Sequence, residues 1–181
     1  MSRAFFDEVA DALVGFLPPH LNQFNSRRSG RNLKVWFGDD GAEHYEVQLA
    51  GGRLEIGWHA EHRDAGRNDA ALAQLTDAEP AWREALGPEP EAGRFLGRFG
   101  PVWRRVSEVW DGPGLDGPET AIEAADRLAA YVSALESIRS PALAPTTRRT
   151  ASRGARRGRP PSPSSTGRAA GRTGGRRAPA P

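Results

Sequence analysis

The chain has 181 residues, enough for one domain of ordinary size, and it contains no cysteine. Disulfides, cysteine-ligated zinc fingers, iron–sulfur clusters and thiolate catalysis are therefore excluded. No apolar run approaches the roughly 18–20 residues that cross a bilayer, and the acidic N-terminal segment lacks the apolar core of a signal peptide, so we expect a cytoplasmic location.

The net charge of +2 conceals a strong asymmetry along the chain. Residues 1–138 contain 14 Lys and Arg against all 23 Asp and Glu, a balance of −9, whereas residues 139–181 contain 11 Arg and no acid. Lys34 is the only lysine, and this bias, together with abundant Ala, Gly and Pro, is typical of a GC-rich, bacterial-like composition. An acidic body therefore carries a basic tail.

The first predicted element is an amphipathic helix over residues 2–17. Its apolar side chains follow the spacing of one helical face and are Phe5, Phe6, Val9, Leu13, Phe16 and Leu17. Ser2 can cap the helix, and Pro18 ends it. Residues 20–31 mix polar residues with turn formers, which predicts a loop that can hold one helical turn.

Residues 32–60 predict three antiparallel strands, because three runs alternate apolar and polar residues and each gap carries a turn signal. Gly51 and Gly52 predict a two-residue hairpin turn between the second and third strands, since such turns need positive φ twice. The resulting register pairs Leu49 with Leu54, Gln48 with Glu55, Val47 with Ile56, Tyr45 with Trp58 and His44 with His59.

The connection between the first and second strands must keep apolar side chains on one face. A loop of three residues with a bulge at Gly41 does so, because it sets Phe37 against Tyr45 and Val35 against Val47. The apolar face then carries Leu33, Val35, Phe37, Tyr45, Val47, Leu49, Leu54, Ile56 and Trp58. The opposite face carries three rows, which are Lys34/Gln48/Glu55, Trp36/Glu46/Gly57 and Gly38/His44/His59.

The next segments contain several turn formers. Residues 68–86 predict an interrupted helix that Gly87 ends, because Pro80 cannot lie deep inside a helix. Residues 88–100 contain two prolines and three glycines and are predicted to be a loop. Residues 102–110 fit a strand or a helix, and their β-rich composition and flanking turn residues favour a fourth strand.

The last predicted element is a helix that begins near Pro118 and ends at Ser140. Its apolar stripe consists of Ile122, Ala125, Leu128, Ala129, Val132, Leu135 and Ile138. Beyond it, Leu143 is the only large apolar residue, so this segment cannot bury enough surface to offset its chain entropy. We therefore expect one globular domain over residues 1–139 and a disordered Arg/Pro/Ser-rich basic tail over residues 140–181.

These elements predict a two-layer α+β fold in the order α-β-β-β-α-β-α, with helices packed on one face of the sheet. This order resembles the αβββαβ core of the restriction-endonuclease-like nucleases, which bind a divalent metal on carboxylates of the second and third strands. The resemblance implies that Glu46 and Glu55 bind Mg²⁺ and that Lys34 positions the attacking water. The chain departs from the family's pattern, because no Pro-Asp precedes Glu46 and Gly57 stands where the lysine after Glu55 is expected.

The histidines are a second candidate for chemistry. His44 opposite His59, with Glu61 and His62 close by, could form a nitrogen–oxygen metal site. Strand alternation, however, sends positions 59 and 62 to opposite faces, which favours structural histidines or a solvated strand end.

Trp36 suggests a third interpretation, because the predicted register points it to the polar face. With His44 and His59 it would form a binding surface for a peptide, a base or a small ligand. If a helix or residues 88–100 cover that face, Trp36 is instead simply buried.

The tail is the strongest compositional signal, because arginines without acids attract polyanions such as nucleic acid through counterion release. The arginines assigned to this contact are Arg148, Arg149, Arg153, Arg156, Arg157 and Arg159. The alternative is an extension that is merely tolerated in a GC-rich genome. The sequence thus predicts a small soluble α+β domain acting as a non-catalytic binding or interaction module, with a metal-dependent nuclease as the alternative. No cofactor is expected, apart from Mg²⁺ under that alternative.

Overall fold

The structure, a computed structural model, describes residues 3–112, 115 and 117–140. Its helices are α1 (Arg3–Phe16), α2 (Ala65–Thr76), α3 (Glu79–Leu86) and α4 (Pro118–Arg139), with a 3₁₀ helix η1 (Pro19–Leu21). Its strands are β1 (Asn25–Arg28), β2 (Asn32–Trp36), β3 (Glu43–Ala50), β4 (Arg53–Ala60), β5 (Glu91–Arg94) and β6 (Arg104–Trp110). No helix in the described ranges is long and apolar enough to span a membrane.

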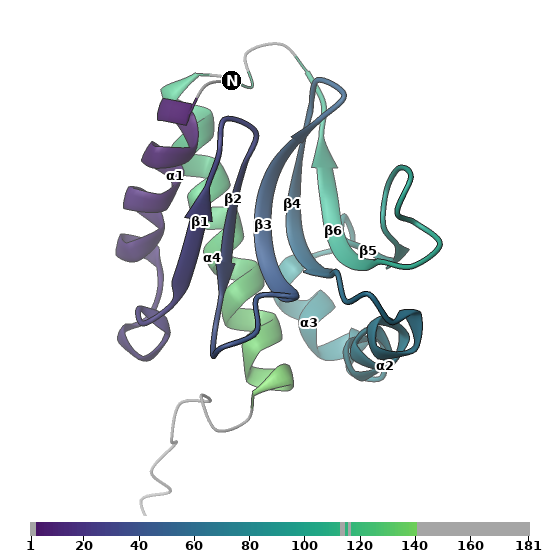
Figure 1. The fold of residues 1–181 in the computed structure, drawn as a ribbon. Helices are drawn as coiled ribbons and strands as arrows, with labels where there is room; N and C mark the ends of the chain where they lie inside the picture. The colour runs from purple at the N-terminus through teal and green to yellow at the C-terminus, as the bar shows by residue number, and fades with distance from the viewer. Residues whose placement is uncertain (1–2, 113–114, 116, 141–181) are drawn as a thin grey trace, which may run out of the picture. The chain divides into compact units, whose positions relative to one another are not determined.

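The six strands form one antiparallel sheet in the order β1-β2-β3-β4-β6-β5 (Figure 1). Helices α1 and α4 pack against one face of this sheet, whereas α2 and α3 lie near the end of β4 from which α2 continues (Figure 1). The predicted α+β class and the packing of helices on one face are therefore confirmed.

The core lies between the sheet and the pair α1 and α4. The fully buried side chains on this face of the three predicted strands are Leu33, Val35, Tyr45, Val47, Leu54, Ile56 and Trp58. They meet apolar residues of the two helices, among them Phe6, Val9, Leu13, Leu128, Val132 and Leu135. Because burial of each large side chain stabilises the fold by about 1.5–3 kcal/mol, this face determines which side of every strand turns inward.

The hairpin between β3 and β4 has the predicted register. Gly51 and Gly52 have φ values of 64° and 83° and form the turn. The pairs of this ladder include Leu49 with Leu54, Gln48 with Glu55, Val47 with Ile56, Tyr45 with Trp58 and His44 with His59.

The predicted register between β2 and β3 is wrong by two residues. Val35 pairs with Tyr45, because residues 37–42 make a longer connection than the predicted three-residue loop. Asp40 accepts a hydrogen bond from the backbone N–H of Ala42 at 2.9 Å and so stabilises this connection. A shift of two residues keeps every side chain on its face, so the apolar face survives the error.

The shift changes the polar rows, however. The predicted rows Lys34/Gln48/Glu55 and Trp36/Glu46/Gly57 are wrong. In the third row the pairing of His44 with His59 is confirmed, but Gly38 does not join it, because β2 ends at Trp36. The observed rows are Asn32/Gln48/Glu55 and Arg27/Lys34/Glu46/Gly57.

Two short edge strands were missed by the sequence analysis. Strand β1 lies within predicted loop 20–31, and β5 lies within predicted loop 88–100. Each has four residues, and β1 is exposed throughout, so neither shows the alternation that marks a half-buried strand. The observed order α-β-β-β-β-α-α-β-β-α therefore differs from the predicted order on which the likeness to nucleases rested.

The remaining elements follow the sequence closely. Residues 104–110 form a strand, and Pro80 lies in the first turn of α3, which Gly87 ends with a φ of 83°. The stripe predicted for α4 is wrong at Ile122, which is 43% exposed, because Ala121 and Ala124 turn inward instead. The predicted disordered tail, with Arg148, Arg149, Arg153, Arg156, Arg157 and Arg159, lies outside the described residues apart from Ser140.

Candidate functional site

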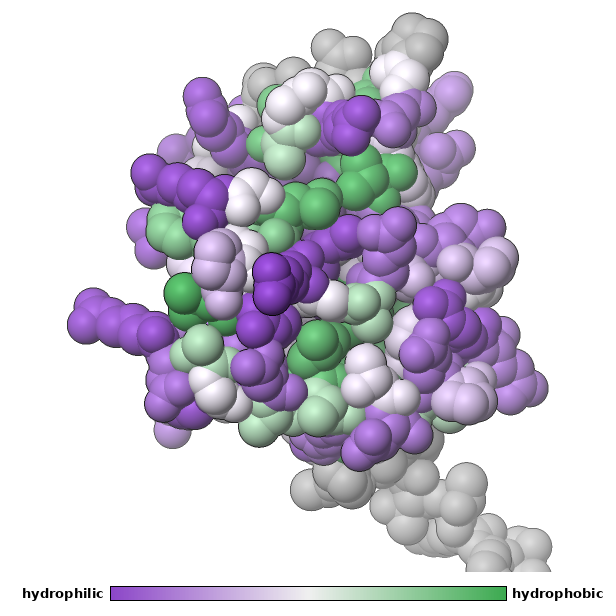
Figure 2. Space-filling view, turned by 90° about the vertical axis from the view of Figure 1, so that its right-hand side faces the viewer, coloured by the Kyte–Doolittle hydropathy of each residue, from purple (hydrophilic) through white to green (hydrophobic). Residues whose placement is uncertain are grey.

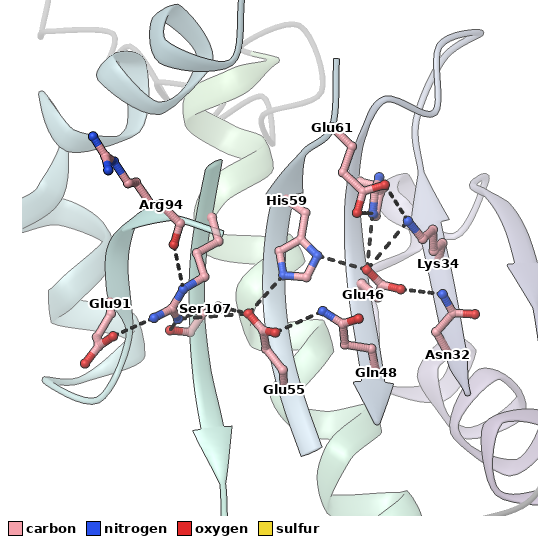
Figure 3. Close-up of polar contacts among 12 residues, drawn as sticks. Asn32, Lys34, Glu46, Gln48, Glu55, His59, Glu61, Glu91, Arg94 and Ser107 are labelled. Carbon is pink, nitrogen blue, oxygen red and sulfur yellow. Dashed lines mark hydrogen bonds and ion pairs between the residues drawn. The ribbon is translucent and has the colours of Figure 1, made fainter. Parts of the chain in front are cut away.

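The face of the sheet opposite α1 and α4 carries a line of charged side chains that runs from β2 to β5 (Figure 3). We call this line the polar row; it consists of Lys34, Glu46, His59, Glu55, Ser107, Arg105 and Glu91, with Glu61 beside Lys34. Its centre is buried, because Glu46, Glu55 and His59 are each 1% exposed or less. A buried charge must be paired and hydrogen-bonded, so the contacts within this row determine whether the fold tolerates it.

The connection between β5 and β6 covers part of the row. The Phe95 ring meets the His59 ring edge-on at a centroid distance of 5.0 Å, and Trp103 packs against Phe95 at 5.3 Å. On the outside, Leu96 and Phe99 remain 42% and 37% exposed. Figure 2 shows the side of the molecule that carries this connection, where apolar patches interrupt polar surface. Residues 88–100 were predicted as one possible cover of the polar face, and through Phe95 they do cover it at His59.

His59 bridges the two buried carboxylates. Its Nδ1 lies 2.9 Å from Oε2 of Glu46, and its Nε2 lies 3.3 Å from Oε1 of Glu55. Burial alone would lower the pKa of His59, but hydrogen bonds and charges of Glu46 and Glu55 outweigh it and raise the pKa to about 9. At neutral pH the ring is therefore an imidazolium that donates to both carboxylates.

Glu46 is ionised despite its burial. Burial raises its pKa, but the side-chain contacts with His44 and His59 outweigh this effect and hold the pKa well below its usual range. Its Oε1 also accepts a hydrogen bond from Asn32 at 2.5 Å.

Glu55 is ionised for a similar reason. Burial raises its pKa, while hydrogen bonds from His59 and Ser107 lower it below the usual value. The Ser107 hydroxyl donates to Oε1 at 2.6 Å, and the Gln48 amide donates to Oε2 at 2.9 Å.

Gly57 allows His59 and Glu55 to meet. The two residues lie four positions apart on β4, which separates their backbones by about 13 Å, so their side chains must lean toward each other over Gly57. A Cβ at Gly57 would lie only 2.3 Å from the carbonyl oxygen of Val106, so no side chain fits there. The sequence analysis placed Gly57 in a row with Trp36 and Glu46, and it missed that two residues of one strand can meet over a glycine.

His44, Lys34 and Glu61 surround the other side of Glu46. His44 Nδ1 lies 2.9 Å from the carbonyl oxygen of Gly41, and its Nε2 lies 3.4 Å from Oε2 of Glu46. Lys34 Nζ lies 2.7 Å from Oε2 of Glu61 and 3.7 Å from Oε2 of Glu46. The four residues whose potential ligand atoms lie within 4.8 Å of one another are His44, Glu46, His59 and Glu61.

A hollow of about 540 Å³ opens beside this group. Its lining residues are Arg27, Ser29, Asn32, Lys34, Trp36, Gly41 and Glu61. Trp36 is half-buried, and its ring lies against Gly41, where an added Cβ would be 3.2 Å from the indole. Lys34 and Glu61 are the members of the charged group that line the hollow, while Glu46 and His59 lie behind them.

The structure brings together only some of the predicted site residues. Lys34 reaches Glu46, but His59 stands between Glu46 and Glu55, so these carboxylates do not face one shared ion. Trp36 lines the hollow, as the binding interpretation requires, whereas His44 and His59 are buried.

One predicted residue lies elsewhere, and two functional residues were missed. His62 pairs with Glu43 at 3.0 Å and stays outside the group around Glu46. The missed residues are Arg105 and Ser107, which extend the row on β6. Because β6 carries charged residues on both faces, its sequence did not indicate which face Arg105 and Ser107 would point to.

No protein-family model matches the chain, and no characterised protein or solved structure matches it either. The functional argument therefore rests on the chemistry of the polar row and the hollow. Each region contains one serine, and neither hydroxyl bonds to a histidine: Ser29 donates to Asn32, and Ser107 donates to Glu55. Neither serine has the histidine contact that activates a hydroxyl nucleophile.

Proposed function

We propose that this chain is a non-catalytic binding module that holds its ligand in the hollow beside Trp36. The observation that carries the proposal is a contrast in exposure. Glu46, Glu55 and His59 are 1% exposed or less and are paired with one another, whereas the Lys34 side chain at the hollow is 24% exposed. A catalytic acid or base must reach the reacting atoms, so the buried carboxylates are better suited to supporting a binding surface.

The hollow has the size and chemistry of a site for a nucleotide. Its volume of about 540 Å³ falls within the roughly 300–1,000 Å³ typical of small-ligand sites. Trp36, which is half-buried in the lining, offers an aromatic face for a base. Arg27 is exposed, lies directly opposite Lys34 in the ladder and also lines the hollow, so it offers a cation for a phosphate beside the Lys34–Glu61 pair. Aromatic stacking combined with cations is the usual basis of single-strand binding.

The tail supports the same ligand class by its composition. Its arginines, without any acid, would add a salt-dependent attraction to polyanions. We therefore propose single-stranded nucleic acid as the ligand, with the tail supplying most of the attraction and Trp36 supplying a stacking contact.

Fluorescence anisotropy of a labelled oligothymidylate tests this proposal with three full-length variants. Trp36→Thr should weaken binding by about 5- to 150-fold, which corresponds to the roughly 1–3 kcal/mol of one stacked base. Substitution of the six tail arginines 148, 149, 153, 156, 157 and 159 by Gln should lower both the affinity and its salt dependence. Phe16→Ala, which removes an aromatic residue that is 44% exposed on α1, should change nothing. Unchanged binding in the first two variants would refute the proposal.

One observation favours the nuclease alternative, namely the 3.7 Å contact between Lys34 and Glu46. If that alternative holds, Mg²⁺ or Mn²⁺ supports cleavage of nucleic acid, and Glu46→Gln or Glu55→Gln abolishes it. Cleavage that survives both substitutions rules it out. The position of His59 between the two carboxylates argues for the binding module instead.

A further inference from the structure

His44 has a ring nitrogen that faces two carboxylates. Nδ1 lies 2.9 Å from the carbonyl oxygen of Gly41, which can only accept, so Nδ1 donates that hydrogen bond. Nε2 is thereby turned toward Oε2 of Glu46 at 3.4 Å and Oε1 of Glu61 at 3.8 Å. His44 is 1% exposed, so bulk water does not screen this contact. A ring nitrogen and two carboxylate oxygens therefore meet at one buried point.

The distances from Nε2 of His44 to the two carboxylate oxygens suit a tetrahedral metal ion, and the potential ligand atoms of the group all lie within 4.8 Å of one another. Ligand atoms about 2.0–2.2 Å from a zinc ion lie roughly 3.3–3.6 Å apart at the tetrahedral angle. The observed 3.4 Å and 3.8 Å therefore need only a small closure around an ion.

Each of the three atoms belongs to a side chain that a neighbouring group holds in place. These supporting pairs are Gly41 with His44, His59 with Glu46, and Lys34 with Glu61. Lys34 bonds Oε2 of Glu61, which leaves Oε1 turned toward His44. Such supporting hydrogen bonds fix ligand orientation in metal sites, and a backbone carbonyl on the second nitrogen of a histidine is a common one.

We propose that Nε2 of His44, Oε2 of Glu46 and Oε1 of Glu61 bind a divalent transition-metal ion, with Zn²⁺ as the leading candidate. One imidazole with two carboxylates suits this class of ion, whereas Mg²⁺ and Ca²⁺ prefer oxygen ligands alone. Glu61 lines the hollow, so the ion has a route of entry there. The site does not depend on nucleic-acid binding, and it departs from the sequence-based expectation of no cofactor.

The test is a calorimetric titration of the full-length chain with Zn²⁺ after treatment with EDTA and dialysis. The wild-type chain should bind one equivalent, and its thermal midpoint should rise with Zn²⁺. Glu61→Gln should weaken binding about tenfold or more, and it preserves the shape of a side chain that is 14% exposed. His44→Gln should have the same effect.

Two matched controls keep the interpretation specific. Glu91→Gln removes a carboxylate at the far end of the polar row, and His20→Gln removes an exposed histidine of η1. Both should bind Zn²⁺ like the wild-type chain. Absence of stoichiometric binding in the wild-type chain would overturn the proposal. A Zn²⁺ affinity of Glu61→Gln equal to that of the wild-type chain would overturn it as well, and this result stands even if His44→Gln does not fold. Binding of Mg²⁺ as tight as that of Zn²⁺ would also overturn it.

Discussion

The apolar face of the sheet and the centre of the polar row on its other face are both buried, but different forces hold them. The face toward α1 and α4 is filled by apolar side chains whose contribution depends on area and not on partner identity. The opposite face holds Glu46, His59 and Glu55, each of which is stable only beside a particular neighbour. The first face should therefore tolerate small changes that the second does not.

The register of β2 illustrates this difference. A shift of two residues leaves the apolar face intact, because Leu33 and Val35 still point inward. The same shift decides whether Lys34 faces Gln48 or Glu46, and so whether Glu46 has a cation on that side. Apolar packing determines only which face of a strand turns inward, whereas the polar row also depends on which residue stands opposite which.

Alkaline pH should break the polar contacts that lie on the apolar side, and this is the largest effect we expect. The chain has two tyrosines, Tyr45 and Tyr131, which donate hydrogen bonds to the buried carboxylates of Glu136 and Glu108. Burial and these charges raise the pKa of both phenols above the usual value of 10.

The sign of this linkage follows from the raised pKa. The stability from each phenol is fully present below about pH 10 and is lost as pH rises through the folded-state pKa. Absorbance at 295 nm should therefore stay flat through pH 10 and rise together with the loss of helical circular dichroism. Ionisation of either tyrosine near pH 10 in a folded chain would contradict the burial of these two groups.

His59→Ala should produce the next largest loss, on the polar face. The substitution leaves two buried carboxylates without the cation between them, and breaking such a pair costs about 3–5 kcal/mol. Urea unfolding measures the loss. Adding Glu46→Gln and Glu55→Gln to His59→Ala should recover part of it, because the uncompensated charges are then gone. A loss below about 1 kcal/mol, within the range of exposed ion pairs, would show that the row is solvated.

Much of the fold could be predicted from the sequence, because strong local patterns specify it. Gly51 and Gly52 gave the β3–β4 register, and with it the pair His44 and His59. The edge strands β1 and β5 could not be predicted, since their pairing comes from the neighbouring strand and not from apolar alternation of their own.

The site was less accessible to sequence reasoning than the fold. The sequence analysis recognised four polar residues of one face, namely Lys34, Glu46, Glu55 and His59. It did not predict their contacts, because these join side chains that do not stand directly opposite each other in the sheet. His59 meets Glu55 over Gly57, which has no side chain, and a contact between two residues of one strand does not follow from the pairing of neighbouring strands.

Ile56→Val is the smallest change and the sharpest test of the contrast between the faces. Ile56 is fully buried on the apolar face, and along β4 it lies between Glu55 and Gly57, which point to the polar face. Removal of one methylene should cost about 0.5–1.5 kcal/mol in urea unfolding, because the surrounding side chains relax into part of the space. Since the side chain carries no charge, this loss should be the same at low and high salt, and Zn²⁺ affinity should be unchanged. A loss as large as that of His59→Ala would mean that the apolar packing is as intolerant as the polar row, and that the two faces do not differ in the way proposed.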